Sequence, residues 1–194
     1  NELINLEYSD SKARIIEVIE GELITNIFSE KLKAENNRVI SDIDKDILKV
    51  VVVNRYKENE ISVGFIKGFG LKKGAIAESI AHDSHHIIAV GVDDRSIIEC
   101  LDFVIKGRGG VCYYDGNKIH GLSLPVYGLM SAESANSVAS AYSKINNKVI
   151  IDGCKLKSPF MTLSFMALTV IPNLKISPRG LVDVTQFKFV DLYF

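Results

Sequence analysis

The sequence predicts an α+β domain, in which mixed or antiparallel β-sheets stack against two main amphipathic helices. Segments with strand-like patterns clearly outnumber helical ones. Their order is not the regular alternation of strand and helix that builds a doubly covered parallel sheet. A TIM barrel is also excluded by size, because such a barrel needs roughly 200–250 residues and the chain has 194.

The first third of the chain is predicted to be β structure. Segments rich in β-branched residues run from Arg14 to Glu20 and from Leu23 to Phe28, with the turn residue Gly21 between them. A polar stretch follows from Glu30 to Arg38, in which Asn36-Asn37 indicate a turn.

A continuous apolar run from Ile47 to Val53 is typical of a strand that is covered on both faces. A charged segment separates it from Ile61–Ile66, so the two are expected to form an antiparallel hairpin. Ala75–Ala81 and Ile87–Val90 are further strand candidates, and they flank a polar tract at His82–His86.

The hydrophobic period then changes to that of a helix. Asp93-Asp94 are suited to cap its first turn, and Gly107 is suited to end it. A second helix is expected to start near Ser131 and to end at Asn146-Asn147. The apolar faces comprise Ile97, Ile98, Leu101, Val104 and Ile105 in the first helix, and Ala135, Val138, Ala139, Tyr142 and Ile145 in the second.

The last part of the chain returns to strand patterns. Gly110–Tyr114 and Lys118–Leu124 are expected to pair through a turn at Asp115-Gly116-Asn117. Phe160–Ile171 is too short and too polar to cross a membrane, and its first part, Phe160–Ala167, is expected to be a buried core segment. Phe187–Tyr193 is the last expected strand.

Composition excludes several classes of protein. Lys plus Arg (23) nearly cancels Asp plus Glu (24), so the basic excess of a nucleic-acid-binding protein is missing. No membrane partner is expected, and the N-terminus lacks the basic and apolar regions of a signal peptide. Cys100, Cys112 and Cys154 lack metal-site or disulfide spacing, which favours a reducing compartment, the cytoplasm.

The densest polar cluster is His82-Asp83-Ser84-His85-His86, which holds three of the four histidines of the chain. Imidazoles serve as metal ligands, acid–base groups or hydrogen-bond donors. Four interpretations stay open: a metal site, a nucleophilic Ser/His/Asp set, a hydrogen-bonded turn, and a substrate-facing loop without metal. Composition favours the turn, because no outer metal ligands are visible and triad residues rarely lie this close in sequence.

Three glycine-containing motifs are weaker candidates. Gly68–Gly74 is one residue away from the dinucleotide fingerprint, so a structural loop is the better interpretation. Arg108-Gly109-Gly110 and Pro178-Arg179-Gly180 each place an arginine beside glycine, which suits either an anion site or an exposed turn. The exposed turn is favoured for both. The Phe160–Met166 stripe could line a ligand pocket, but core packing is the default.

Several blocks, in order along the chain, resemble the C-terminal region of adenine deaminases of the bacterial and archaeal amidohydrolase type. They cover most of residues 46–194, and the looser N-terminal β segment also fits. The blocks are Asp46–Lys49, Gly64–Ala77, Ala81–His85, Leu124–Ser131, Pro159–Phe165 and Arg179–Val184.

The resemblance implies hydrolytic deamination of adenine to hypoxanthine and ammonia in purine salvage. In such enzymes a hydroxide activated by a divalent metal, manganese or iron, attacks C6 of the base, and an acidic residue shuttles the proton. The metal ligands belong to a preceding barrel, and the His-x-His pair that opens such sites is absent here. No metal ligand is therefore assigned to this chain, and the fragment alone is expected to be inactive.

The resemblance also favours the interpretation that the loop of His82, Asp83, Ser84 and His85 faces the substrate. We expect these residues to face the mouth of the barrel and to help close the adenine pocket. Residues 1–45 would join the preceding domain, and residues 46–194 would form the C-terminal domain of a cytoplasmic homo-oligomer. This chain would contact adenine as a partner through the preceding barrel domain. The alternative is a standalone, non-catalytic module of the same family for binding or oligomerisation. An independent small hydrolase that uses the histidine loop is the weakest hypothesis.

Overall fold

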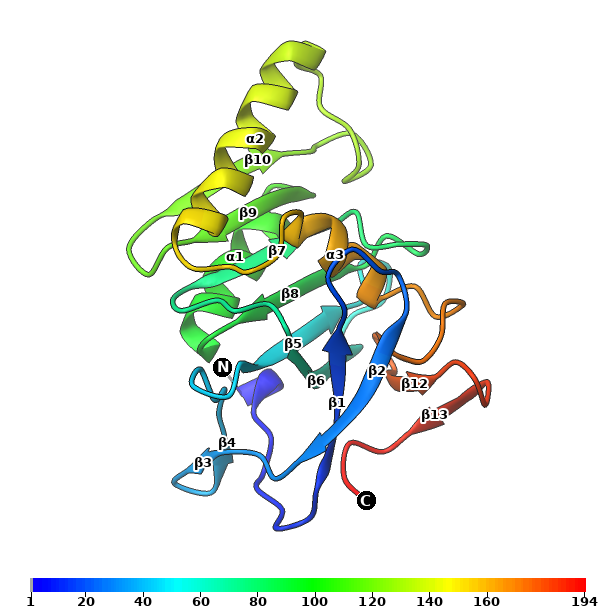
Figure 1. Cartoon of the computed structure of the whole chain (residues 1–194). Helices are drawn as coiled ribbons and strands as arrows, with labels where there is room; N and C mark the ends of the chain where they lie inside the picture. Colours follow the sequence, from blue (N-terminus) through cyan, green and yellow to red (C-terminus); the bar gives the residue numbers. More distant parts are fainter. Residues whose placement is uncertain (1) are drawn as a thin grey trace.

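A computed structural model describes residues 2–194, and its largest element is an eight-stranded sheet (Figure 1). The strand order is β10-β9-β7-β8-β5-β6-β1-β2. Neighbouring strands are antiparallel, except that β1 and β6 are parallel. The strands are β1 (Ala13–Val18), β2 (Thr25–Glu30), β5 (Ile47–Val53), β6 (Ile61–Lys67), β7 (Ala75–Glu78), β8 (Ile87–Gly91), β9 (Gly110–Tyr114) and β10 (Ile119–Ser123).

The other elements are smaller sheets and helices. A three-stranded antiparallel sheet consists of β11 (Leu174–Ser177), β12 (Gly180–Asp183) and β13 (Lys188–Val190). A two-stranded hairpin joins β3 (Ala34–Glu35) to β4 (Arg38–Val39) through the predicted turn. The helices are the short 3₁₀ helix η1 (Glu2–Ile4), α1 (Asp94–Lys106), α2 (Ala135–Ile151) and α3 (Pro159–Met166).

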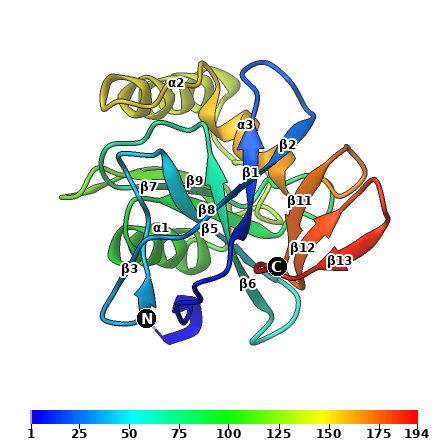
Figure 2. The same cartoon turned by 60° about the horizontal axis from the view of Figure 1, so that its bottom comes forward.

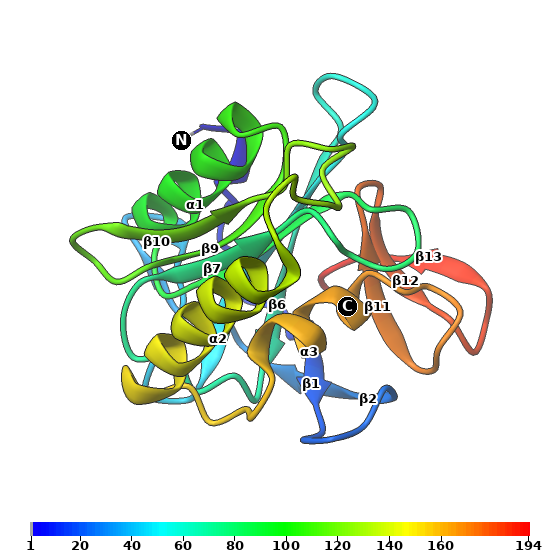
Figure 3. The ribbon, with the colours of Figure 1, turned by 90° about the horizontal axis from the view of Figure 1, so that it is seen from above.

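The helices cover both faces of the large sheet, as Figures 2 and 3 show for α1 on one side and α2 with α3 on the other. One core cluster joins α1 to Val51, Ala77 and Ala89 of the sheet. A larger cluster on the opposite face joins the sheet to α2, α3 and the three-stranded sheet. The predicted α+β class is confirmed, and residues 2–194 form no closed barrel.

Strand β5 lies in the middle of the molecule, as its continuous apolar run predicted. It pairs with β6 on one side and β8 on the other, which confirms the hairpin of residues 47–66. Its one charged residue, Lys49, is 1% exposed. The ammonium group lies 2.5 Å from Asp94 Oδ1 and donates to the carbonyl of Ile4. The buried positive charge of Lys49, which interrupts the apolar run of β5, is thus paired with the carboxylate of Asp94.

Helix α1 follows its sequence signals closely. The Asp93 side chain accepts hydrogen bonds from the amide (2.8 Å) and the hydroxyl (2.9 Å) of Ser96, and Gly107 caps the other end. Ile97, Cys100 and Val104 are fully buried against the sheet. The two caps therefore define where this helix begins and ends, and the buried apolar face defines which side packs against the sheet.

Replacing Asp93 with alanine is expected to lower the free energy of unfolding by about 0.5–2 kcal/mol, because the first turn loses its capping acceptor. Urea unfolding would measure the loss. Asp102→Ala is the matched control on the same helix, since Asp102 makes only an exposed ion pair with Lys106, worth about 0.3–0.5 kcal/mol. Equal losses in the two variants would contradict the capping role.

The predicted ends of the second helix are wrong. Helix α2 begins after Ser134, whose hydroxyl accepts from the amide of Ser137, and it continues through Asn146-Asn147 to Ile151. Val149 lies one turn beyond Ile145 and is fully buried. Its burial outweighs the weak preference of asparagine against the helix.

The C-terminal part also differs from the expectation. Phe160–Ala167 contributes to the core as predicted, although Met161 is 52% exposed. The segment forms α3 with Pro159 in the first turn and Ala167 as the C-terminal cap. The strand expected over Phe187–Tyr193 is reduced to Lys188–Val190, and β11 and β12 were not predicted. These strands have three or four residues each, so alternation is too short to mark them and cross-strand pairing decides.

Residues 1–45 were expected to join a preceding domain, and this stays a prediction. Within the described residues, β1 and β2 of this segment belong to the large sheet. None of the helices over residues 2–194 has the length and apolar character that crossing a membrane requires.

Candidate functional site

The histidine loop, residues 81–86, connects β7 to β8 at one end of the large sheet. Ala81 is buried and anchors the loop, whereas Asp83 and Ser84 are exposed. His82, His85 and His86 are half-buried. The structure thus brings the three histidines together on one short loop, with their backbone held by the strands on either side.

His82 is fixed against helix α3. Its amide donates to the carbonyl of Ser164 at 3.1 Å. Its imidazole stacks on the ring of Phe165, with the ring centroids 4.9 Å apart. The end of α3 therefore determines where the loop leaves the sheet.

His85 has a backbone conformation that few side chains adopt. Its φ is +54°, and its amide donates to the carbonyl of Ala81 at 2.8 Å, which closes the turn. Its Nδ1 atom is buried and has no hydrogen-bond partner within residues 2–194. A buried, unpartnered polar atom is costly in a folded protein. This atom is therefore the one in the loop that most needs a further partner.

Arg55 and Tyr56 support the loop from the segment that follows β5. The Arg55 guanidinium donates to the carbonyls of His85 (3.1 Å) and Tyr127 (2.7 Å), and its amide donates to His86 Nδ1 (3.4 Å). The Tyr56 hydroxyl donates to the carbonyl of Ser84 at 3.3 Å. Neither residue was singled out from the sequence. The available signal was that polar residues follow directly after a buried strand.

The surroundings of His86 disfavour its protonated form. Burial lowers its pKa from the ordinary value, and the positive charge of Arg55 adds to this, while Glu60 opposes it. Its ring lies 5.6 Å from that of Tyr56. We expect His86 to be a neutral acceptor for the Arg55 amide at neutral pH.

The structure does not show the geometry that a metal site or a nucleophilic Ser/His/Asp set in the loop would need. Within residues 2–194 no three His, Cys, Asp or Glu side chains gather as a metal would require. The rings of His82 and His85 lie 6.4 Å apart, and that of His82 stacks on Phe165. These residues do not fit a metal centre. In the same described part, the side chains of Asp83 and Ser84 make no hydrogen bond, so no Ser/His/Asp set is assembled.

The glycine motif has a structural explanation. The amide of Gly70 donates to Asp46 Oδ1 at 2.7 Å, so it is engaged by a carboxylate. Gly74 has a φ of +70°, and a Cβ there would lie 1.8 Å from the carbonyl oxygen of Tyr114. Only glycine fits this close approach. The motif therefore shapes the chain, as the structural interpretation predicted.

The remaining candidates separate into core and surface. Phe160, Leu163 and Met166 are fully buried, which confirms core packing for these members of the stripe, whereas Met161 is exposed. The three cysteines are buried free thiols. The guanidinium of Arg179 lies over the ring of Phe189 at 5.0 Å. Arg108 lines a pocket, described below.

The fold and the loop define an α+β domain whose described side chains hold no metal centre of their own. The sequence profile described as the adenine deaminase C-terminal domain matches residues 22–188. The chain therefore belongs to this family, as the resemblance predicted.

The curated relatives extend beyond this chain. A protein named adenine deaminase from Methanosarcina mazei is 48% identical over 182 residues, which are 94% of this chain and 33% of that protein. One of the same name from Archaeoglobus fulgidus is 44% identical over 189 residues, covering 97% of this chain and 33% of that protein. One from Dehalococcoides mccartyi is 45% identical over 184 residues, with coverages of 94% and 32%. The chain spans about a third of the length of these relatives.

Proposed function

We propose that this chain is part of an enzyme that hydrolyses adenine to hypoxanthine and ammonia, as the names of its relatives suggest. The metal that this reaction uses, manganese or iron, is held by residues outside this chain. The support is that the described side chains do not fit a metal centre, while identity to the relatives extends over nearly the whole chain. Purine salvage in the cytoplasm by a homo-oligomer is part of the same proposal.

The role of this domain is to close the adenine pocket with the histidine loop. The supporting observation is that His85 presents a buried Nδ1 atom without a partner, on a loop otherwise held by Ser164, Arg55 and Tyr56. A purine carries several ring nitrogens and an exocyclic amine, so it can supply this hydrogen bond when closure of the loop over it turns the half-buried His85 imidazole toward it. His82 adds an aromatic surface that is held in place by Phe165. These residues bind and orient; the bond-breaking groups lie elsewhere.

Incubating the 194-residue chain with adenine and Mn²⁺ or Fe²⁺ tests this division of labour. We expect no ammonia above the buffer control and no stoichiometric metal after dialysis. A full-length enzyme that contains this chain, assayed in parallel, should release ammonia. Ammonia production by the isolated chain would contradict the proposal, and so would a full-length enzyme that does not act on adenine.

A further inference from the structure

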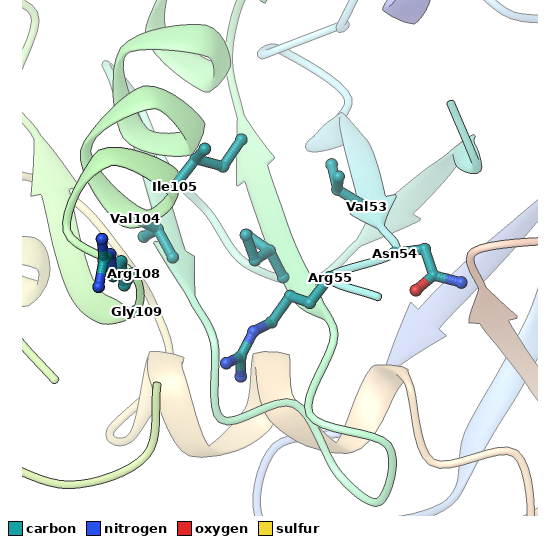
Figure 4. A pocket seen from close by; sticks show the side chains of 8 residues that line it. Val53, Asn54, Arg55, Val104, Ile105, Arg108 and Gly109 are labelled. Atoms are coloured by element: carbon teal, nitrogen blue, oxygen red, sulfur yellow. The ribbon is translucent and has the colours of Figure 1, made fainter. Parts of the chain in front are cut away.

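A concave site lies beside the histidine loop, between the segment after β5 and the end of helix α1. It has a volume of about 340 Å³, near the lower end of the roughly 300–1,000 Å³ typical of small-molecule sites. Figure 4 shows Arg55 on the segment that follows β5 and Arg108 beside Gly109 at the end of helix α1. The lining consists of Val53, Asn54, Arg55, Ile87, Val104, Ile105, Arg108 and Gly109.

The pocket carries two positive charges and no negative one. Among the described residues, no carboxylate lies within 4.0 Å of either guanidinium, and no acidic residue lines the pocket. A guanidinium has five N–H donors. Arg55 uses its side chain for two carbonyls, and the Arg108 side chain makes no hydrogen bond within residues 2–194. Both arginines therefore keep free donors.

The rest of the pocket decides what kind of ligand fits. Val53, Ile87, Val104 and Ile105 supply aliphatic walls. The amide of Asn54 is already engaged, because its oxygen accepts from Tyr56 and Lys57 and its nitrogen donates to Glu60. Among the lining side chains, the two guanidinium groups thus carry most of the free donors. They suit an anionic head, while the walls suit a compact apolar body.

We propose that this pocket binds a small organic anion, a phosphate monoester or a carboxylate joined to a compact apolar group. The anionic head lies between Arg55 and Arg108, and the apolar group lies against Ile87 and Ile105. Both guanidinium forks match such an oxyanion in shape. Binding of such an anion does not depend on the proposed deaminase activity.

The anion site is connected to the histidine loop through one side chain. Arg55 lines the pocket and also donates to the carbonyls of His85 and Tyr127, while its amide donates to His86. An anion that draws the Arg55 guanidinium toward it changes these bonds. Binding therefore perturbs the amide signals of His85 and His86 as well as those of the lining residues.

The test is an NMR titration of ¹⁵N-labelled chain with phenyl phosphate and with benzoate. Benzyl alcohol is the neutral control. We expect saturable shifts at residues 53–55, 85–86 and 105–109 with at least one anion, and none with benzyl alcohol. The comparison of the two anions distinguishes a phosphate from a carboxylate head.

Two variants and one control make the assignment specific. Arg108→Gln should weaken binding by about tenfold or more, because it removes a charge-assisted hydrogen bond. Ile105→Glu, at a wall position that is 52% exposed, should weaken it by repulsion. Arg95→Gln removes an exposed charge at the other end of α1 and should change the dissociation constant less than twofold. No saturable shift with either anion, equal binding of benzyl alcohol, or equal losses in Arg95→Gln and Arg108→Gln would overturn the proposal.

Discussion

Replacing Glu78 with valine is expected to stabilise the protein at pH 8 by about 1–3 kcal/mol, the usual cost of a buried polar group without partners. Glu78 lies in β7 opposite Ile88 and Val111, is fully buried, and has no hydrogen bond to either carboxylate oxygen within residues 2–194. Valine is similar in volume and favours strands. The substitution removes a polar group that nothing in the described structure satisfies.

The same residue should make stability depend on pH. Burial raises the pKa of Glu78 well above its ordinary value of 4.5. The folded state therefore binds its proton more tightly than the unfolded state. The stability that comes from this tighter proton binding is fully present below pH 4.5. It is lost as pH rises toward the folded pKa, by up to about 1.4 kcal/mol per pH unit.

Urea unfolding of wild type and Glu78→Val between pH 4 and pH 8 would measure both effects. The difference in unfolding free energy should grow with pH in favour of the variant. Glu35→Val is the control, because Glu35 is an exposed strand carboxylate that makes no ion pair with any residue from 2 to 194. It should change stability by less than about 0.5 kcal/mol. A pH-independent difference between Glu78→Val and wild type would show that the carboxylate ionises freely in the folded protein.

Replacing His85 in a full-length enzyme that contains this chain is expected to lower kcat/KM for adenine by about 10–100-fold. This is the size of effect expected when one hydrogen bond to a charged or polarised group is lost. His85→Ala and His85→Asn should both show the loss, since neither keeps the imidazole. His120→Ala is the matched control, because His120 lies outside the loop and pairs with Asp115 at 2.8 Å.

The two His85 variants also separate binding from backbone effects. At a φ of +54°, alanine is strained whereas asparagine is tolerated. We expect the melting temperature to fall for His85→Ala and to stay near wild type for His85→Asn. Unchanged kcat/KM in His85→Asn would contradict a substrate-facing role for the imidazole.

The parts of the fold that the sequence predicted are those where several local signals agree. Helix α1 has a capping aspartate, a regular apolar face and a terminal glycine, and β5 has a long apolar run. The end of α2 was missed because burial of Val149 outweighs the turn preference of Asn146-Asn147. Strands β11–β13 were missed because pairing between short segments, rather than local pattern, defines them.

The candidate site could be predicted only in part, for a similar reason. The histidine loop is contiguous in sequence, so a polar tract between two apolar strands marks it. Arg55 comes from 30 residues before His85, and Phe165 comes from far beyond it. Their roles depend on how β5 and α3 pack against the loop, which no local pattern shows.

We propose that this domain contributes a closing loop to an adenine pocket whose reactive centre lies outside it. A crystal structure of the full-length enzyme with an adenine analogue bound tests this most directly. We expect side-chain atoms of His82 or His85 to lie within about 4 Å of the analogue, and every metal ligand to come from outside this chain. A histidine loop facing bulk solvent away from the analogue, or a catalytic metal held by this domain's own side chains, would contradict it.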